Sequence, residues 1–198
     1  MAKVEYALYL DLLSEAALKA KTEIWCYCLM PNHVHLIAVP CDKDGLRETF
    51  ADAHRRYTGY INARLRATGH LWQGRFGSVA MDEAHLFYAV RYVSLNPVRA
   101  KLVQQAQDWR WSSVAAHLSG QDDKLAKVAP ILERYGDLAA LLGQGTADET
   151  EFKSLRQLET TGRPLGSEDD RHSTETSEAW TQEKGSQREI MPFSKLSP

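Results

Sequence analysis

The sequence predicts an α+β fold, because helical and strand-like segments alternate along its first half. Apolar residues recur every three or four positions over residues 5–20, 45–67 and 83–95, which is the spacing of helices that bury one face. Residues 23–30 and 33–40 are rich in apolar and aromatic residues, and only Pro31-Asn32 separates them. Two strands joined by a tight turn are therefore expected between the first and second helices.

The later elements follow from glycine, proline and capping residues. Residues 68–77 include three glycines, which predicts a loop that leads into a short strand around 78–81. Asp82 is suited to cap the helix over 83–95, and Pro97 is expected to end it. Residues 108–118 and 125–142 are expected to form further short helices.

Composition and charge narrow the classes of protein that fit. The chain has 198 residues, 43% hydrophobic and 25% charged, which excludes collagen-like, disulfide-scaffold and wholly disordered classes. The net charge is +3 over residues 1–118 and −5 over residues 119–198. Three cysteines, an odd number, favour reduced thiols. The N-terminus lacks the pattern of a signal peptide, and no membrane helix is expected, so the sequence favours a cytoplasmic protein.

The apolar pattern also suggests a division of the chain. We expect a catalytic domain over residues 1–118 and a helical extension over residues 119–165. Residues 166–198 hold 11 charged residues and only six apolar ones. We therefore expect that tail to be mostly disordered.

Two histidines on the second predicted strand form a candidate metal site. His33 and His35 are two positions apart, so on a strand they share one face about 7 Å apart. Neutral imidazoles at that spacing can bind one divalent metal ion. Two histidines on an exposed strand face can equally be ordinary surface residues, and spacing alone leaves both interpretations open.

The third predicted helix adds oxygen-bearing side chains. Tyr88, Tyr92 and Asn96 are four positions apart, so they share one helix face. Asn96 can supply a third metal ligand and Tyr92 a nucleophile, if the metal polarises the group attacked. From spacing alone, half-buried packing residues are the better explanation of both tyrosines.

Four ordered segments carry a resemblance to a known family. CYCLMPNHVHLIAVP resembles the HUH motif region (histidine, hydrophobic residue, histidine) of the single-tyrosine transposases of insertion sequences and their REP-associated relatives. GHLWQGRF, RYVSLNPVRAKLV and DWRWSSVAAH resemble the family's other hallmark segments, in the same order. TTGRPLGSED is similar to a C-terminal segment of some members.

The resemblance implies a fold, a reaction and partners. It implies a ferredoxin-like α+β sandwich with a central antiparallel sheet that carries the HUH strand, with helices on one face. Members cleave single-stranded DNA beside hairpins through a 5′-phosphotyrosine, and many are homodimers. Matching positions make Tyr92 the nucleophile, and His33, His35 and Asn96 the ligands of Mg²⁺ or Mn²⁺.

Further residues are candidates for DNA contact. Arginines and loop residues in or near the hallmark segments can contact phosphates or stack on bases: Arg75, Arg99, Arg55, Arg56, His70 and Trp72. Trp109 and Trp111 are candidates for base stacking as well. Each arginine can instead be a solvated surface residue, and each tryptophan a core residue.

One departure from the family keeps a second function open. Relatives usually begin with a strand upstream of the first helix, whereas here Met1–Lys3 leads directly into that helix. The loss of an inner strand would expose unpaired edges, unless the domain completes its sheet in another way. The alternative is therefore a catalytically inactive, truncated remnant that binds hairpin DNA. A small metal-binding protein acting on RNA ends is a third possibility.

Overall fold

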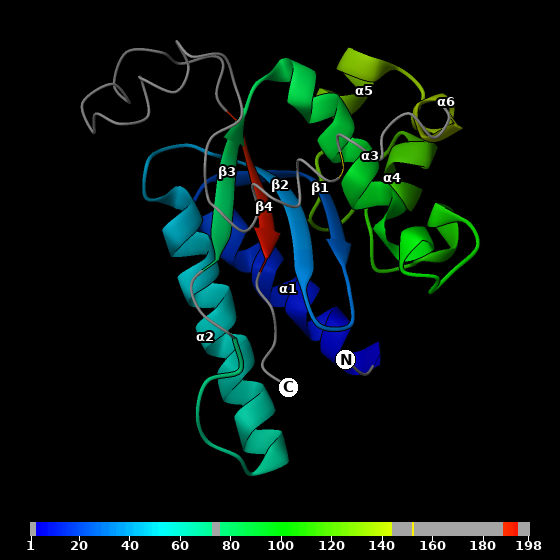
Figure 1. The fold of residues 1–198 in the computed structure, drawn as a ribbon. Helices are drawn as coiled ribbons and strands as arrows, with labels where there is room; N and C mark the ends of the chain where they lie inside the picture. Colours follow the sequence, from blue (N-terminus) through cyan, green and yellow to red (C-terminus); the bar gives the residue numbers. More distant parts are fainter. Residues whose placement is uncertain (1–2, 73–75, 144–151, 153–187, 194–198) are drawn as a thin grey trace.

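The computed structural model describes residues 3–72, 76–143, 152 and 188–193. Helices α1 (Lys3–Lys19), α2 (Gly45–Leu65) and α3 (Glu83–Arg99) are the long ones (Figure 1). The short helices lie between residues 106 and 143: η1 (Ala106–Asp108), α4 (Val114–Ser119), α5 (Ala129–Tyr135) and α6 (Leu138–Gly143). The strands are β1 (Thr22–Leu29), β2 (Val34–Pro40), β3 (Gly77–Met81) and β4 (Arg188–Phe193).

The four strands form one antiparallel sheet in the order β1-β2-β4-β3. β1 and β2 form the predicted hairpin, which the hydrogen bond from Met30 N to His33 O closes at 2.8 Å. Leu29 N donates to Trp111 O, and Lys127 N donates to Ile24 O, so the following segments cover the outer edge of β1. The predicted α+β class is confirmed, and the arrangement is compatible with a ferredoxin-like sandwich.

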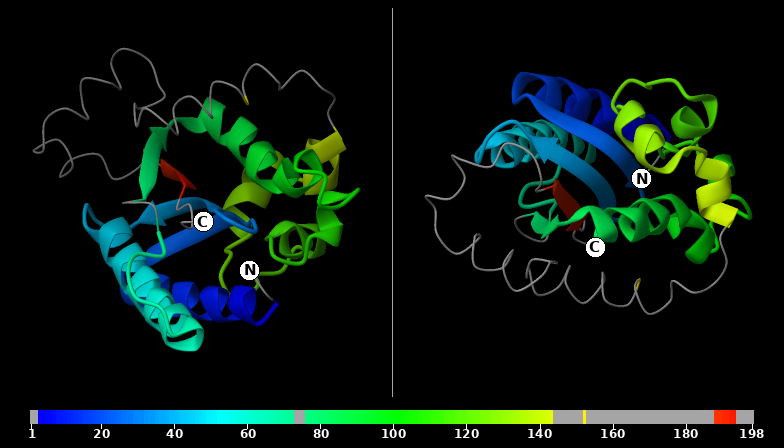
Figure 2. Two further views of the ribbon diagram at one scale, coloured as in Figure 1. Left: turned by 60° about the horizontal axis from the view of Figure 1, so that its bottom comes forward. Right: turned by 90° about the horizontal axis from the view of Figure 1, so that it is seen from above.

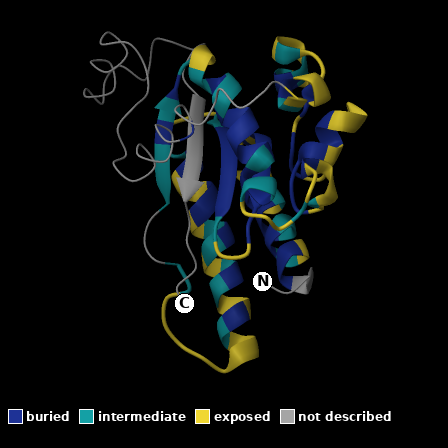
Figure 3. Ribbon diagram, turned by 45° about the vertical axis from the view of Figure 1, so that its right-hand side comes forward, coloured by how far each residue is buried: buried dark blue, intermediate teal, exposed yellow. Residues whose placement is uncertain are grey.

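Helices cover both faces of the sheet rather than the single face that was expected. Helices α1 and α2 pack on one face, where Leu13, Leu36 and Phe50 belong to one buried cluster. Helix α3 and the short helices pack on the other face, where Ile37 and Val90 belong to a second cluster. Figure 2 shows the sheet between these two layers, and Figure 3 shows how completely β1 and β2 are buried.

Helix α3 begins as predicted and ends later than predicted. Asp82 caps it, because its carboxylate accepts a hydrogen bond of 2.9 Å from His85 N. Pro97 does not end the helix, which continues to Arg99. Proline lacks only one N–H and has a helical φ. Near the end of a helix the loss is small, and Leu102 N still donates to Pro97 O.

The C-terminal strand β4 lies within the segment 166–198, which was expected to be mostly disordered. Its residues 188–193 form an inner strand of the sheet. This strand lies between β2 and β3 and pairs with both, so the backbone groups on the facing edges of these two strands are not left unpaired. Residues 166–187 and 194–198 lie outside the described residues.

Among the described residues, no helix combines the length and apolar character needed to cross a membrane.

Candidate active site

The two histidines lie at the start of β2 and face helix α3. His33 directly precedes β2, and its Nδ1 lies 2.7 Å from Asn32 Oδ1. His35 has no exposed surface, and its ring centre lies 4.7 Å from that of His33. Because strand side chains alternate, His35 shares the α3 face with Ile37, while Leu36 belongs to the other core. The predicted pairing of the histidines on one face is confirmed.

Helix α3 brings Asn96 and Tyr92 to the same place. The Asn96 amide nitrogen lies 2.8 Å from His35 Nε2. The Tyr92 ring centre lies 5.3 Å from that of His35. The four-residue spacing on one helix face therefore places both side chains against the HUH strand. Four of the predicted site residues form one cluster contributed by two elements.

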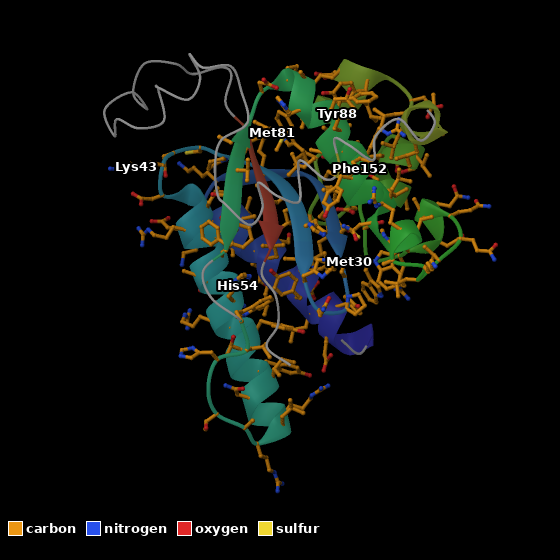
Figure 4. The ribbon with its side chains drawn as sticks, in the orientation of Figure 1. Met30, Lys43, His54, Met81, Tyr88 and Phe152 are labelled. Carbon is orange, nitrogen blue, oxygen red and sulfur yellow. The ribbon has the colours of Figure 1, made fainter. Side chains whose placement is uncertain are left out.

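The cluster is enclosed by Arg99, which the sequence suggested, and by Phe152, which it did not. Tyr92 is 3% exposed, and the Phe152 ring lies 5.6 Å from it. The Arg99 guanidinium lies 4.4 Å from the centre of the Phe152 ring and 6.0 Å from that of Tyr92. Arg91 is also buried, beside Phe87. Two arginines thus lie on the helix that carries the tyrosine, and Figure 4 shows Phe152 beside it.

The donor set fits a divalent metal ion. Asn96 Nδ2 and His35 Nε2 are within hydrogen-bond distance at 2.8 Å, so these two side chains are close enough to bind one ion. A half-turn of the amide exchanges its nitrogen for its oxygen, and the oxygen is the atom that a metal binds. Among the described residues no three of His, Cys, Asp and Glu form a metal cluster. His33, His35 and Asn96 are therefore the candidate ligands.

A nearby cysteine is not a good ligand. Cys28 is the cross-strand partner of His35 and is fully buried. Burial raises the pKa of its thiol well above the usual value of 9. Its Sγ donates instead to Met30 Sδ at 3.7 Å. A neutral thiol in an apolar core is a packing residue rather than a metal ligand.

The structure does not bring the other predicted DNA contacts to this cluster. Arg55 and Arg56 lie on α2, across the sheet from α3, and both form ion pairs with Asp52. His70 is exposed in the loop after α2. Trp72 stacks on His54 with ring centres 4.0 Å apart. Of the predicted arginines, Arg99 is in the cluster and Arg75 lies outside the described residues.

The remaining aromatic candidates have packing partners. Trp111 stacks on Tyr6 with ring centres 4.9 Å apart and is 8% exposed. Trp109 donates from Nε1 to Leu29 O at 3.0 Å. Tyr88 is half-buried against Phe87, one turn from Tyr92 on α3.

Fold and site together define a class of protein: an α+β domain in which paired histidines on a central strand meet an amide and a tyrosine from one helix. Residues 4–96 match the family model described as "Transposase IS200 like". This part of the chain, which holds all four clustered residues, is similar to that family, and the similarity supports a transposase-type function. Searches of curated proteins and of solved structures found no match.

Proposed function

We propose that this protein cleaves single-stranded DNA and rejoins it, with Tyr92 as the nucleophile. The observation that carries the proposal is the cluster of His33, His35 and Asn96 against the ring of Tyr92. The family match supports a transposase-type activity and DNA as the partner. A hairpin-flanked single strand is the proposed substrate.

The proposed reaction exchanges one phosphodiester bond for another. The Tyr92 oxygen attacks phosphorus and loses its proton, while the bond from phosphorus to the 3′ oxygen breaks. The 3′ oxygen takes its electron pair and gains a proton, which leaves a free 3′-OH and a 5′-phosphotyrosine. Attack by another 3′-OH reverses the step and joins two strands. The covalent link keeps the bond energy, so rejoining requires no nucleotide cofactor.

The chain's own residues favour a phosphate at this place. Imidazole and amide side chains add no negative charge, and the guanidinium of Arg99 supplies a positive charge beside Tyr92. Tyr92 is almost fully buried, so a phosphate reaches its hydroxyl only after the side chains over it, including Phe152, move apart.

A divalent ion is the proposed cofactor. His33, His35 and Asn96 would hold it, and it would neutralise the charge that develops on the phosphate oxygens. Imidazole donors suit Mn²⁺ better than Mg²⁺, which prefers oxygen ligands.

The test is the covalent adduct. The protein is incubated with 5′- or 3′-labelled hairpin DNA, taken from repeats that flank its gene, in Mn²⁺, in Mg²⁺ or in EDTA. A denaturing gel then separates free DNA from DNA linked to protein. We expect an adduct that retains the label 3′ of the cut, requires the metal and disappears in Tyr92→Phe.

Tyr88→Phe is the matched control, because Tyr88 lies one turn away on the same helix. An adduct that is lost in Tyr88→Phe and kept in Tyr92→Phe contradicts the assignment of the nucleophile. Hairpin binding by the folded wild type without any adduct favours the inactive remnant instead. Sedimentation of the same samples tests the expected homodimer.

A further inference from the structure

Strand β4 connects the two parts of the candidate site, although it lies far along the chain from both. It pairs with β2 at Leu36, Ile37 and Ala38, directly after His35. It pairs on its other side with β3, from Gly77 to Met81. β3 leads through Asp82 into α3, which carries Tyr92 and Asn96. The two elements that supply the site are thus joined through β4.

Within the described part of the chain, β3 has no other strand partner. The order β1-β2-β4-β3 places β2 and β3 on opposite sides of β4. Without β4, the N–H and C=O groups of β2 and β3 that bond to it lose their hydrogen bonds. The three β2 residues in this ladder, Leu36, Ile37 and Ala38, have no exposed surface, and unpaired backbone groups at such positions are costly.

The sequence of this segment has the features of a strand in this position. Residues 190–193 contain three of the six apolar residues found between 166 and 198. Pro192 cannot donate a ladder hydrogen bond. It lies at the register shift between Gly77 and Val79, where two residues of β4 oppose Ser78 alone. A bulge is a place where an inner strand tolerates proline.

We propose that segment 188–193 is a clamp, which pairs within its own molecule and holds the HUH strand and the tyrosine helix in register. The clamp lies outside the family match of residues 4–96. Its importance for cleavage rests on the proposed function, whereas its effect on the sheet is a property of the folded chain. Helix α3 also contacts β1 and β2 directly, so loss of the clamp loosens the site without removing every contact.

The test compares two shortened chains with the full chain. One ends at Gln187 and lacks the strand, and the other ends at Phe193 and keeps it. Hydrogen exchange is followed by mass spectrometry in peptides that cover β3, β2 and, as the internal control, β1. We expect exchange in β3 and in the 36–38 region to be at least about tenfold faster in the chain that ends at Gln187. The chain that ends at Phe193 should match the full chain.

A second variant keeps the length of the chain. Ile190→Pro removes an N–H from the middle of β4, and Ser194→Pro, outside the strand, is its matched control. Faster exchange in Ile190→Pro but not in Ser194→Pro supports the clamp. So does restored protection when a synthetic peptide of residues 188–193 is added to the chain that ends at Gln187. Failure of only that chain to fold also supports a structural role for the strand.

Several outcomes would overturn the proposal. Equal exchange in β3 for all chains means that β4 does not hold the sheet. Protection that falls on dilution, together with a dimer in light scattering, means that a second copy supplies the strand. Mn²⁺ affinity should fall about tenfold with loss of the clamp, and unchanged affinity refutes the link to the site. If the exchange results hold but no chain forms the DNA adduct, the clamp stands and the proposed function fails.

Discussion

A half-buried histidine far from the candidate site makes the stability of this protein depend on pH. His54 on α2 stacks on Trp72, and its Nε2 lies 3.0 Å from the fully buried Tyr9 hydroxyl. Figure 4 labels His54 on α2, well away from Phe152. Burial lowers the pKa of His54 from 6.5 to about 4. The folded protein therefore keeps this ring neutral at a pH where the unfolded chain protonates it.

The sign and size of the effect follow from these two pKa values. Between pH 6.5 and 4 the unfolded state binds one proton more than the folded state, so stability falls as the pH falls. From pH 7.5 to 5.5, His54 alone lowers the free energy of unfolding by about 1.3 kcal/mol. His117, whose pKa burial also lowers, adds a contribution of the same sign.

The assay is urea unfolding, followed by tryptophan fluorescence across this pH range. His54→Gln keeps a hydrogen-bonding amide near Tyr9 but cannot titrate. Its free energy of unfolding should therefore fall by about 1.3 kcal/mol less than that of the wild type between pH 7.5 and 5.5. Ala51→Gln, at an exposed position of the same helix, is the control and should keep the wild-type dependence. An unchanged pH dependence in His54→Gln would refute the argument.

Three further predictions concern single positions. Arg66 caps α2 with φ 52°, a conformation that glycine adopts without strain. Arg66→Gly should therefore raise the free energy of unfolding by about 0.5–1 kcal/mol, seen as a higher thermal midpoint, whereas Arg66→Ala should not. Cys41 is the exposed thiol, and the other two cysteines are buried; a thiol reagent should therefore modify one cysteine in the native protein and three in urea, and a second fast-reacting thiol would contradict this burial. A Cβ at Gly45 would lie 3.0 Å from Pro40 Cβ, whereas one at Gly59 meets nothing within 4 Å. Chemical denaturation should therefore show Gly45→Ala to be less stable by about 1–3 kcal/mol and Gly59→Ala to be more stable by about 1 kcal/mol.

Local patterns were sufficient for the elements that carry the site. The alternation over residues 33–40 gave the shared face of His33 and His35, and the four-residue spacing gave that of Tyr92 and Asn96. Both depend only on the geometry of one strand or one helix. Asp82 was found for the same reason, because a cap acts within a single turn.

Features that depend on distant partners could not be read from the sequence. β4 is a strand because two other strands pair with it, and its apolar residues alone are too few to indicate this. Phe152 follows a polar segment, and its contact with Tyr92 has no local signal. Pro97 was expected to end a helix by local preference, but the helix continues to Arg99, because a proline near the last turn removes only one hydrogen bond.

The division of the interior by the sheet has a consequence for how this protein can change. The residues under α1 and α2 and those under α3 form separate buried clusters, and energetic effects of substitutions without shared partners add. A stabilising change beside Tyr57 on α2 can therefore offset a destabilising change near Tyr92 without altering the contacts of Tyr92. Stabilising substitutions on one face of the sheet can therefore compensate for destabilising substitutions on the other face.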